Sequence, residues 1–493
     1  MIQRKIDNYL TNFYAKHKKA LLVTGARQIG KTSSIREFGR THFKHFVEIN
    51  FLESPAAKSV FEGTDSSNIL LRLSAYTETK LVKGETLIFL DEIQECPDAV
   101  TAIKFLVEEG SYRYIMSGSL LGVELKDIRS LPVGFLTIKE MFPLDFEEFA
   151  RAVGVQAEVL DSVRAAFKNK VKVDSVIHEK MMEIFRLYLV VGGMPAAVAE
   201  YLESNNIQNI LEIQQSIIEL YKKDIAKYDP ENKLYLNEIF DLIPPELNNQ
   251  NKRFILKKLN ENIKFSRHEN SFIWLKEAGV ALPVYNVDEP KIPLLLSRSR
   301  NLFKLFLNDV GLLTCQYANG IQLKILNGEN AINFGSVYEN VAAMELRAHG
   351  FDLYYFNSKK QGELDFVIER NGRVLPIEIK SGKDYKRHNA LKNALETVNY
   401  AIQEAIVFCN DNVCVKEKVL YYPIYMLMFL ENEKINLGTY KVDLHELVKH
   451  THHIKSKQKN KSEAKESSNT SLRGRSEPAT SKVLRRQSKE GLN

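Results

Sequence analysis

Residues 20–39 read ALLVTGARQIGKTSSIREFG, and this stretch decides the fold of the N-terminal part. The first five residues have the apolar character of a buried strand, and SSIREFG is helical in pattern. Between them, GARQIGKT fits the spacing G-x-x-x-x-G-K-[ST], in which glycines let backbone N–H groups wrap a phosphate. The sequence therefore predicts a phosphate-binding loop between a strand and a helix.

The motif assigns chemistry to the loop. Lys31 is expected to reach the β and γ phosphate oxygens, and Thr32 to offer its hydroxyl to Mg²⁺. ATP and Mg²⁺ are thus the expected cofactors. The residues predicted to hold the nucleotide are Gly25, Ala26, Arg27, Gln28, Ile29, Gly30, Lys31, Thr32 and Ser33, with Asp91 and Ser117 from later strands.

A second motif, LIFLDEIQ at residues 87–94, ends an apolar run in two acids. Asp91 is predicted to hold Mg²⁺ together with Thr32, and Glu92 to act as the general base that polarises the attacking water. A third run, YRYIMSGS, ends in Ser117 and Ser119. Either serine is a candidate to sense the γ-phosphate, or instead to cap the next helix.

The order of patterns along the chain predicts an α/β protein of several parts. Strand and helix patterns alternate in 1–150, which favours a P-loop NTPase domain with a parallel sheet. Residues 151–330 are mostly helical in pattern, and about 231–290 are compatible with a winged helix. Residues 331–450 return to an α/β pattern of helix, three strands, helix and strand. We find no internal repeat.

Within the C-terminal part, GELDFVIERNGRVLPIEIKSGK at residues 362–383 predicts a hairpin, because Asn-Gly is the strongest signal for a two-residue type I′ turn. With Asn371 and Gly372 as the loop, Asp365 faces Glu378 and Glu363 faces Lys380. The expected buried face consists of Leu364, Phe366, Ile368, Leu375, Ile377 and Ile379.

Two interpretations of the charged residues stay open. A solvated polar face explains Glu363 opposite Lys380, but opposed carboxylates destabilise a sheet. A shared Mg²⁺ or Mn²⁺ removes that conflict between Asp365 and Glu378, and Lys380 then neutralises a phosphate. The predicted catalytic residues here are Asp365, Glu378 and Lys380, and the predicted metal ligands on the hairpin are Asp365 and Glu378.

Five motifs follow one another along the chain: TGARQIGKT, FLDEIQECP, IMSGSLLG, MFPLDFEEFA and YLVVGGMPAAV. As an ordered set, they resemble the prokaryotic AAA-type, archaeal-ATPase-like proteins with a C-terminal domain of unknown function, family 4143. The resemblance extends to about residue 430. It implies an AAA-type ATPase in 1–150, with sites that often lie between subunits of an oligomer. The motif D-x12-E-x-K, with Glu339 before it, resembles the restriction-endonuclease-like nucleases. The resemblance implies that fold for 331–450 and Glu339 as a further metal ligand.

Charge is concentrated at the end of the chain. Residues 454–493 hold eleven Lys or Arg and four Glu, a net of +7, so residues 1–453 carry a net of −1 and give no sign of nucleic-acid binding from bulk charge. Residues 451–493 lack aromatics and are predicted to be a disordered basic tail, either inert or in contact with an acidic partner.

Composition also predicts a compartment. The four cysteines form neither a CxxC pair nor a zinc pattern, which favours a reduced protein. No apolar run approaches the roughly 20 residues of a membrane span. We therefore expect a cytoplasmic protein without a membrane partner.

Two functions are compatible with these motifs. The first is an ATPase coupled to a C-terminal nuclease that acts on DNA or RNA. The alternative is an ATP-dependent switch whose C-terminal domain binds nucleic acid or a protein partner without cleavage. Both predict ATP hydrolysis, whereas the sequence leaves nuclease activity undecided.

Overall fold

The computed structural model describes residues 2–118, 132, 134–228, 233–249, 254, 272–329, 334–433, 438–439, 441–442, 455 and 457–461. The chain divides into two units, Met1–Glu433 and Lys434–Asn493. Both sheets belong to the first unit. Most of the predicted disordered tail, 451–493, lies outside the described residues.

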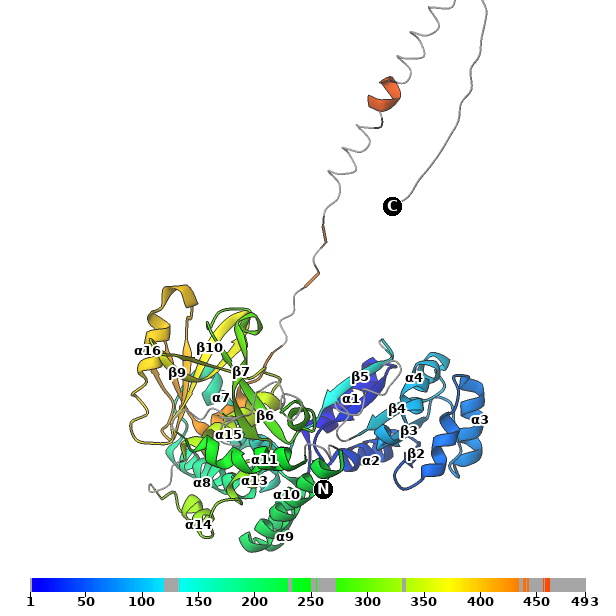
Figure 1. The fold of residues 1–493 in the computed structure, drawn as a ribbon, viewed down its shortest axis with the longest axis horizontal. Coiled ribbons are helices and arrows are strands. Elements are labelled where there is room, and N and C mark those ends of the chain that lie inside the picture. The colour runs from blue at the N-terminus through cyan, green and yellow to red at the C-terminus, as the bar shows by residue number, and fades with distance from the viewer. Residues whose placement is uncertain are drawn as a thin grey trace, which may run out of the picture. The chain divides into compact units, whose positions relative to one another are not determined.

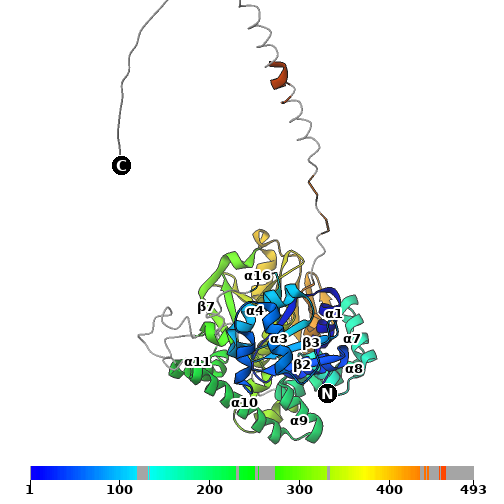
Figure 2. The ribbon, with the colours of Figure 1, turned by 90° about the vertical axis from the view of Figure 1, so that its right-hand side faces the viewer.

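The first sheet confirms the parallel sheet predicted for 1–150. All of its pairs are parallel and its strand order is β2-β3-β4-β1-β5. Helices α1 and α2 pack on one face, and α3 and α4 pack on the other, in front of the strands in Figure 2. The elements are α1 Lys5–Lys16, β1 Ala20–Thr24, α2 Lys31–His42, β2 His45–Asn50, η1 Pro55–Phe61, α3 Ser66–Tyr76, β3 Thr86–Asp91, η2 Ile93–Glu95, α4 Pro97–Glu109, β4 Arg113–Ser117 and β5 Leu136–Glu140.

The central strands β1, β3 and β4 are buried on both faces because their apolar residues are continuous. In β1, Leu21 and Val23 join the core under α1 and α2, whereas Ala20 and Leu22 join the core under α3 and α4. This is the pattern expected of a parallel sheet covered by helices. The carboxyl ends of β1, β3 and β4 meet at one edge, where the predicted site residues lie.

The middle of the chain is helical, as predicted. Helices α8 and α10, of 17 and 22 residues, form much of it (Figure 1). The elements are α6 Phe146–Ala152, α7 Ala157–Asn169, α8 Ser175–Val191, α9 Pro195–Ser204, α10 Ile207–Tyr228, α11 Lys233–Leu247, β6 Ala281–Val287, η5 Leu294–Ser297, β7 Arg298–Leu307, α13 Val310–Thr314 and α14 Ile321–Leu326.

The winged helix expected at about 231–290 is not confirmed. Residues 250–253 and 255–271 lie outside the described residues. Strand β6, expected as its strand, instead pairs with β7 and with β8 of the second sheet. The hydrogen bonds of β6 are therefore satisfied within the C-terminal sheet.

The second sheet has the order β12-β13-β11-β10-β9-β8-β6-β7. Helix α15 packs on one face with the large core, and α16 packs on the other, beside β9 (Figure 1). The predicted order of helix, three strands, helix and strand is confirmed. The elements are α15 Gly335–Ala348, β8 Tyr354–Ser358, β9 Gly362–Arg370, β10 Arg373–Ile379, α16 Asn389–Glu396, η6 Val398–Tyr400, β11 Ala405–Cys409, β12 Cys414–Lys416, β13 Val419–Pro423 and η7 Ile424–Phe429.

The hairpin of β9 and β10 has the predicted register. Its ladder runs from Arg370–Arg373 to Phe366–Ile377, and Asn371 and Gly372 both have positive φ, 52° and 69°, as a type I′ turn requires. One part of the predicted buried face is wrong. Leu364 packs with the opposite core, because the register between β8 and β9 shifts between Leu364 and Val367.

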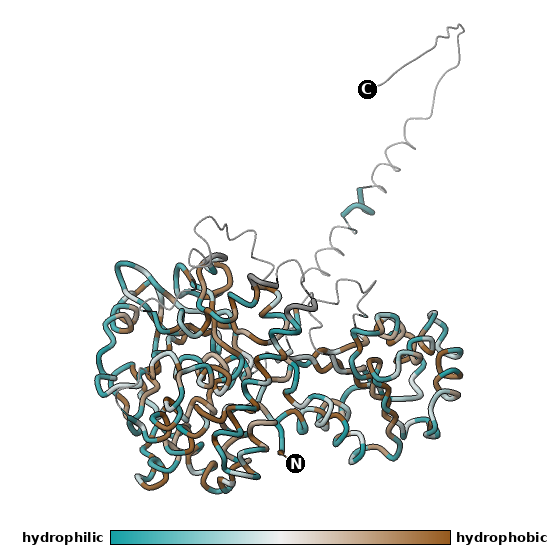
Figure 3. Tube along the Cα trace, turned by 60° about the horizontal axis from the view of Figure 1, so that its bottom comes forward, coloured by the Kyte–Doolittle hydropathy of each residue, from teal (hydrophilic) through white to brown (hydrophobic). Residues whose placement is uncertain are grey.

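Hydrophobic residues gather in the interior of the folded part, and hydrophilic residues are frequent along its outer turns (Figure 3). Among the described residues, no single helix has the length and apolar character needed to cross a membrane. One sharply bent pair, α8 with α9, meets those criteria jointly.

Candidate functional site

The predicted phosphate loop connects β1 to α2 with the geometry that its glycines permit. Gly25 has φ 135°, and a Cβ there would lie 2.3 Å from the carbonyl oxygen of Met141. Gly30 has φ 91° and precedes the first turn of α2. A side chain at Gly25 would therefore displace the loop, which explains the glycine at this position.

Lys31 lies inside the loop. Its Nζ donates to the carbonyl oxygens of Gly25, at 3.0 Å, and Ala26, at 2.7 Å. Burial lowers the pKa of Lys31 to about 8, although the charges of Glu92 and Asp91 act in the opposite direction. The Lys31 ammonium therefore donates its hydrogen bonds to loop carbonyl oxygens, at the position where a bound phosphate would accept them.

Asp91 connects the strand ends. Its carboxylate accepts hydrogen bonds from Thr32 Oγ1 at 3.1 Å and Asn50 Nδ2 at 3.4 Å, and from the hydroxyl of Ser117. The structure therefore brings together three residues predicted from separate motifs, Thr32, Asp91 and Ser117. Ser119, the other candidate sensor, lies outside the described residues.

Glu92 follows Asp91 in a left-handed backbone conformation, with φ 52° and ψ 50°. Its Oε2 accepts a hydrogen bond of 2.5 Å from Gln94 Nε2. A non-glycine residue in this region is uncommon and typical of functional sites. The charge of Glu92 acts on Lys31 of the phosphate loop, because it raises the pKa of that lysine against the larger effect of burial.

Arg27, predicted to contact the nucleotide, reaches α10 instead. Its Nη1 lies 2.6 Å from Oδ1 of Asp224, and its carbonyl oxygen accepts from the hydroxyl of Tyr221 at 3.3 Å. The phosphate loop is therefore fastened to the helical region. The sequence pattern contained no signal for this pairing.

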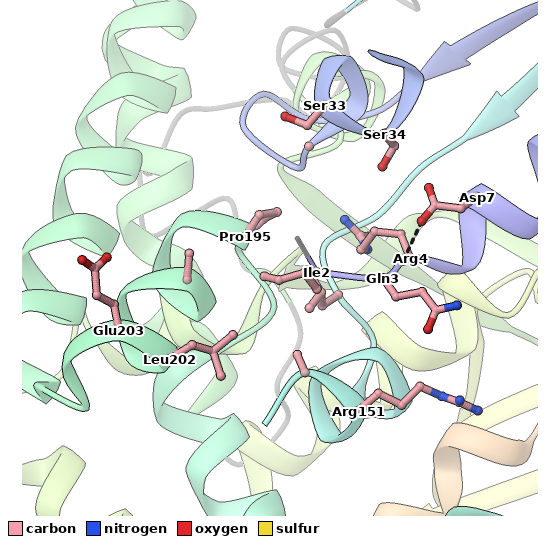
Figure 4. Close-up of a pocket in the computed structure, with 14 residues that line it drawn as sticks. Ile2, Gln3, Arg4, Asp7, Ser33, Ser34, Arg151, Pro195, Leu202 and Glu203 are labelled. Carbon is pink, nitrogen blue, oxygen red and sulfur yellow. Dashed lines mark hydrogen bonds between the residues drawn. The ribbon is translucent and has the colours of Figure 1, made fainter. Parts of the chain in front are cut away.

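A cavity of about 760 Å³ opens beside the start of α2, and Figure 4 shows the residues around it. Gly30, Ser33 and Ser34 line it from the loop side, and Pro195 and Leu202 line it from α9. The N-terminal residues Ile2, Gln3, Arg4 and Asp7 complete the wall. The sequence analysis missed these residues, because only the fold brings the chain start and α9 to the loop.

Arg4 holds the N-terminal residues in place on their side of the cavity. Its guanidinium donates to the carbonyl oxygens of Ile29, at 2.9 Å, and Phe142, at 2.7 Å, and pairs with Glu148 at 3.2 Å. A buried arginine with several partners is well positioned. The chain start is thereby held against the phosphate loop.

The two facing carboxylates of the C-terminal hairpin and Glu339 on α15 are buried, which excludes the solvated-face interpretation for them, whereas Lys380 is partly exposed. Glu378 is 2% exposed, Asp365 9% and Glu339 1%. Lys380 Nζ lies 2.6 Å from Glu378 Oε2 and 3.9 Å from Asp365 Oδ2, and Asp365 also accepts from the backbone N–H of Ile379. Lys380 thus bridges the two carboxylates.

Lys304, on β7, is the residue that sequence analysis missed. It is fully buried, and its Nζ lies 2.7 Å from Glu363 Oε1 and 3.6 Å from Glu339 Oε2. The predicted facing of Glu363 and Lys380 is therefore wrong, since the register shift beside β8 directs Glu363 to Lys304. A lysine inside the apolar run NLFKLFL was the available signal.

These contacts set the electrostatics of the cluster. Burial, and then the charge of Asp365, raise the pKa of Glu378 to about 8. Although burial opposes it, Asp365 and Glu378 raise the pKa of Lys380. Glu339 and Glu363 do the same for the pKa of Lys304. The lysines therefore remain cationic among the carboxylates.

Within the described ranges, no group of three or more His, Cys, Asp and Glu side chains is arranged to hold a metal ion. The metal roles of Glu339, Asp365 and Glu378 stay predictions. Their oxygen donors suit Mg²⁺ or Mn²⁺ chemically, but the carboxylates are engaged by two lysines.

Comparisons with known families match three parts of the chain. Residues 17–150 match an AAA domain, residues 182–323 a Domain of unknown function (DUF8612), and residues 334–427 a Domain of unknown function (DUF4143). No curated protein matches the chain.

Several solved structures are similar to parts of it. The Walker-type ATPase PABY2304 of Pyrococcus abyssi has 15% identity and a TM-score of 0.39, over 64% of this chain and 95% of that chain. The ORC1 protein of Aeropyrum pernix, solved in complex with DNA, has 13% identity and a TM-score of 0.23, over 67% and 93%. RuvB of Thermotoga maritima has 13% identity and a TM-score of 0.26, over 61% and 91%.

The family match and the loop geometry agree for the N-terminal part. The matched region contains the glycine loop, Lys31 and the Asp91 hydrogen bonds. Residues 17–150 are an AAA-like P-loop ATPase domain.

Proposed function

We propose that this protein binds ATP with Mg²⁺ at the phosphate loop and hydrolyses it. The observation that carries the proposal is the meeting of Thr32 and Ser117 on Asp91 at the mouth of the loop. Hydroxyl and carboxylate oxygens suit Mg²⁺, which neutralises phosphate charge when bound. Lys31 would exchange its loop carbonyls for phosphate oxygens, and Glu92 would accept the proton of the attacking water.

The cavity beside α2 supports a place for the nucleoside. It adjoins Gly30, and it combines apolar residues such as Ile2, Leu144 and Pro195 with a few polar groups. Such lining is typical of small-molecule pockets. We propose that the adenine base lies there, between the chain start and α9.

Two substitutions test the ATPase. Lys31→Ala should weaken ATP binding, and Glu92→Gln should slow hydrolysis while sparing binding, by about 10²-fold or more in turnover for loss of a general base. Nucleotide titration and phosphate release measure the two effects separately. Unchanged turnover in Glu92→Gln would identify a different base.

We further propose that the C-terminal domain has a restriction-endonuclease-like fold and hydrolyses phosphodiesters of nucleic acid. The bridging of Asp365 and Glu378 by Lys380, with Glu339 nearby through Lys304, supports it. A divalent metal would polarise the scissile phosphate. Asp365, Glu378 and Glu339 would hold it, and Lys380 would stabilise the developing charge.

Cleavage is tested with plasmid, linear DNA and RNA, with Mg²⁺ or Mn²⁺, and with or without ATP. Cleavage that disappears in Asp365→Ala is the expected result. If the wild-type protein cuts no substrate faster than Asp365→Ala, the nuclease proposal fails.

The lysine contacts favour a second candidate, an ATP-dependent switch whose C-terminal domain binds without cutting. Lys304 and Lys380 already balance part of the carboxylate charge without a metal. In this case, nucleic-acid binding would be unaffected by Glu378→Ala. Binding to neither DNA nor RNA at low salt would favour a protein partner.

A further inference from the structure

Basic side chains gather beside the carboxylate cluster, although the folded part as a whole is nearly neutral. Residues 380–392 hold five Lys or Arg and one Asp, and the turn before β9 adds two lysines. We define the basic rim as the six residues of these segments that are exposed to solvent: Lys359, Lys360, Lys383, Lys386, Arg387 and Lys392.

The two segments of the basic rim form one surface. Asn393 Nδ2 donates to the carbonyl oxygen of Gln361 at 3.1 Å, and Gln361 also contacts Thr397 and Tyr400 through its side-chain amide. A Cβ on Gly362 would come within 2.9 Å of Ala390 Cβ. The turn before β9 is therefore packed directly against α16.

The loop after β10 is held at both ends. Asn410 Nδ2 donates to the carbonyl oxygen of Ser381 at 2.8 Å, and the His388 ring lies 2.7 Å from the hydroxyl of Tyr421. The Tyr385 ring meets the Tyr421 ring edge-on at 5.7 Å. The charged residues between these anchors are thus presented on a fixed path, which reduces the entropy lost on binding.

Few acids neutralise the basic rim. Within the described ranges, its ion pairs are Arg387 with Asp384 at 3.9 Å and Lys392 with Glu396 at 3.8 Å, both exposed. Exposed pairs at such distances are weak. The basic rim is therefore available to an external polyanion.

We propose that the basic rim binds the phosphate backbone of nucleic acid and directs it to the carboxylate cluster. The inference rests on the proposed phosphodiester hydrolysis, because Lys380 at the cluster is continuous in sequence with the rim loop. Nucleic acid fits better than an acidic protein, since regularly spaced phosphates match lysines from two segments without a fixed side-chain pattern.

The test compares two full-length variants with the same loss of charge. Lys383→Gln, Lys386→Gln and Arg387→Gln together remove half of the basic rim. Lys16→Gln, Lys18→Gln and Lys19→Gln remove three exposed lysines of the ATPase domain. Fluorescence anisotropy follows binding of labelled duplex DNA and single-stranded RNA over a salt series, in EDTA and without nucleotide. The basic chain end is present in both variants, so its contribution cancels.

The rim variant should bind about tenfold or more weakly, with a logarithmic salt slope lower by about 2 to 3, because each lost phosphate contact removes roughly 0.7 to 0.9. The control variant should bind like the wild-type protein, and circular dichroism should show both folded. Equal binding by the two variants would overturn the inference. So would loss of binding to anionic vesicles or polyglutamate while nucleic-acid binding is unchanged.

A cleavage assay with Mg²⁺ separates this inference from the proposed function. Rim-dependent binding by a protein that cuts nothing would remove the nuclease proposal and leave the binding surface. Cleavage by the wild-type protein, with nucleic-acid binding unchanged in the rim variant, would support the nuclease proposal and remove the binding surface.

Discussion

At the scale of single residues, the carboxylates of β9 and β10 show how one electrostatic conflict has two solutions. From the sequence, Asp365 opposite Glu378 requires a cation, and a metal ion is the expected one. In the structure, Lys380 lies between them, and Lys304 does the same for Glu339 and Glu363. The need for positive charge was predictable, but its source depended on β7, which is distant in sequence.

Lys304 gives the first prediction at this scale. Lys304→Met should destabilise the protein by about 3–5 kcal/mol, because it leaves Glu339 buried without its cation. Urea unfolding measures the cost. Adding Glu339→Gln should recover part of the stability, since removing both partners costs less than removing one. A single variant as stable as the wild-type protein would show that Lys304 does not carry this charge balance.

At the scale of elements, α6 and α15 meet through buried charges. His349 on the C-terminal side of α15 lies 3.4 Å from Asp145 and 3.6 Å from Glu345, and its Nδ1 is 3.0 Å from the carbonyl oxygen of Leu430. Lys5 of α1 faces the same group, 2.7 Å from Asp145. The ATPase domain is thereby fastened to the helix that carries Glu339.

This junction should respond to pH. Burial lowers the pKa of His349, but Asp145 and Glu345 outweigh burial and raise it overall. A histidine whose pKa is raised by folding contributes its full stabilisation below about pH 6.5. This contribution is lost as the pH rises through the pKa of the histidine in the folded state. Burial, and then Asp145, raise the pKa of Glu345 to about 7, so stability from this group also falls as the pH rises from its unfolded value.

We therefore predict that His349→Leu costs about 3 kcal/mol in weakly acidic buffer, as expected for a buried ion pair that loses one partner. The cost should shrink in alkaline buffer, where wild-type His349 has lost its proton. Urea unfolding at both pH values measures this. A cost that is constant with pH would mean that His349 contributes packing rather than charge.

Elements also show where sequence analysis succeeds. The register of β9 and β10 was predictable because Asn371 and Gly372 fix it locally. The position of Leu364 was not, because it depends on the neighbouring strand β8. Likewise, β6 and β7 were assigned to the helical middle region, since the parallel pairing of β6 with β8 joins residues about 70 apart in sequence and β7 joins the sheet only through β6. The position of the phosphate loop between β1 and α2 was predictable, whereas the Arg27–Asp224 pair and the cavity wall were not.

At the scale of the whole molecule, the phosphate loop is connected to the sheet that carries the carboxylates. Tyr221 links the carbonyl oxygen of Arg27 to Asn308 after β7, at 3.3 and 3.5 Å. Asn340, next to Glu339, exchanges two hydrogen bonds with the backbone of Leu307. Such a contiguous network gives nucleotide binding a physical route to the cluster, which coupling measurements must test.

Gly279 provides a second contact between the phosphate loop and the C-terminal sheet, because it lies against the loop from just before β6. It has φ 71°, and a Cβ there would lie 3.0 Å from the backbone nitrogen of Ala26. Gly279→Ala should therefore displace the phosphate loop, although the two lie more than 250 residues apart in sequence. ATP binding should weaken by roughly tenfold, within the usual range of coupling between sites.

Gly320→Ala is the matched control, since Gly320 has φ 87° but no atom within 4 Å of the added Cβ. Both variants carry a backbone strain of about 1–2 kcal/mol, so any difference between them reports the contact with Ala26. Titration with a fluorescent ATP analogue in Mg²⁺ measures it, and equal affinities for the two variants would show that the contact between β6 and the loop does not affect nucleotide binding.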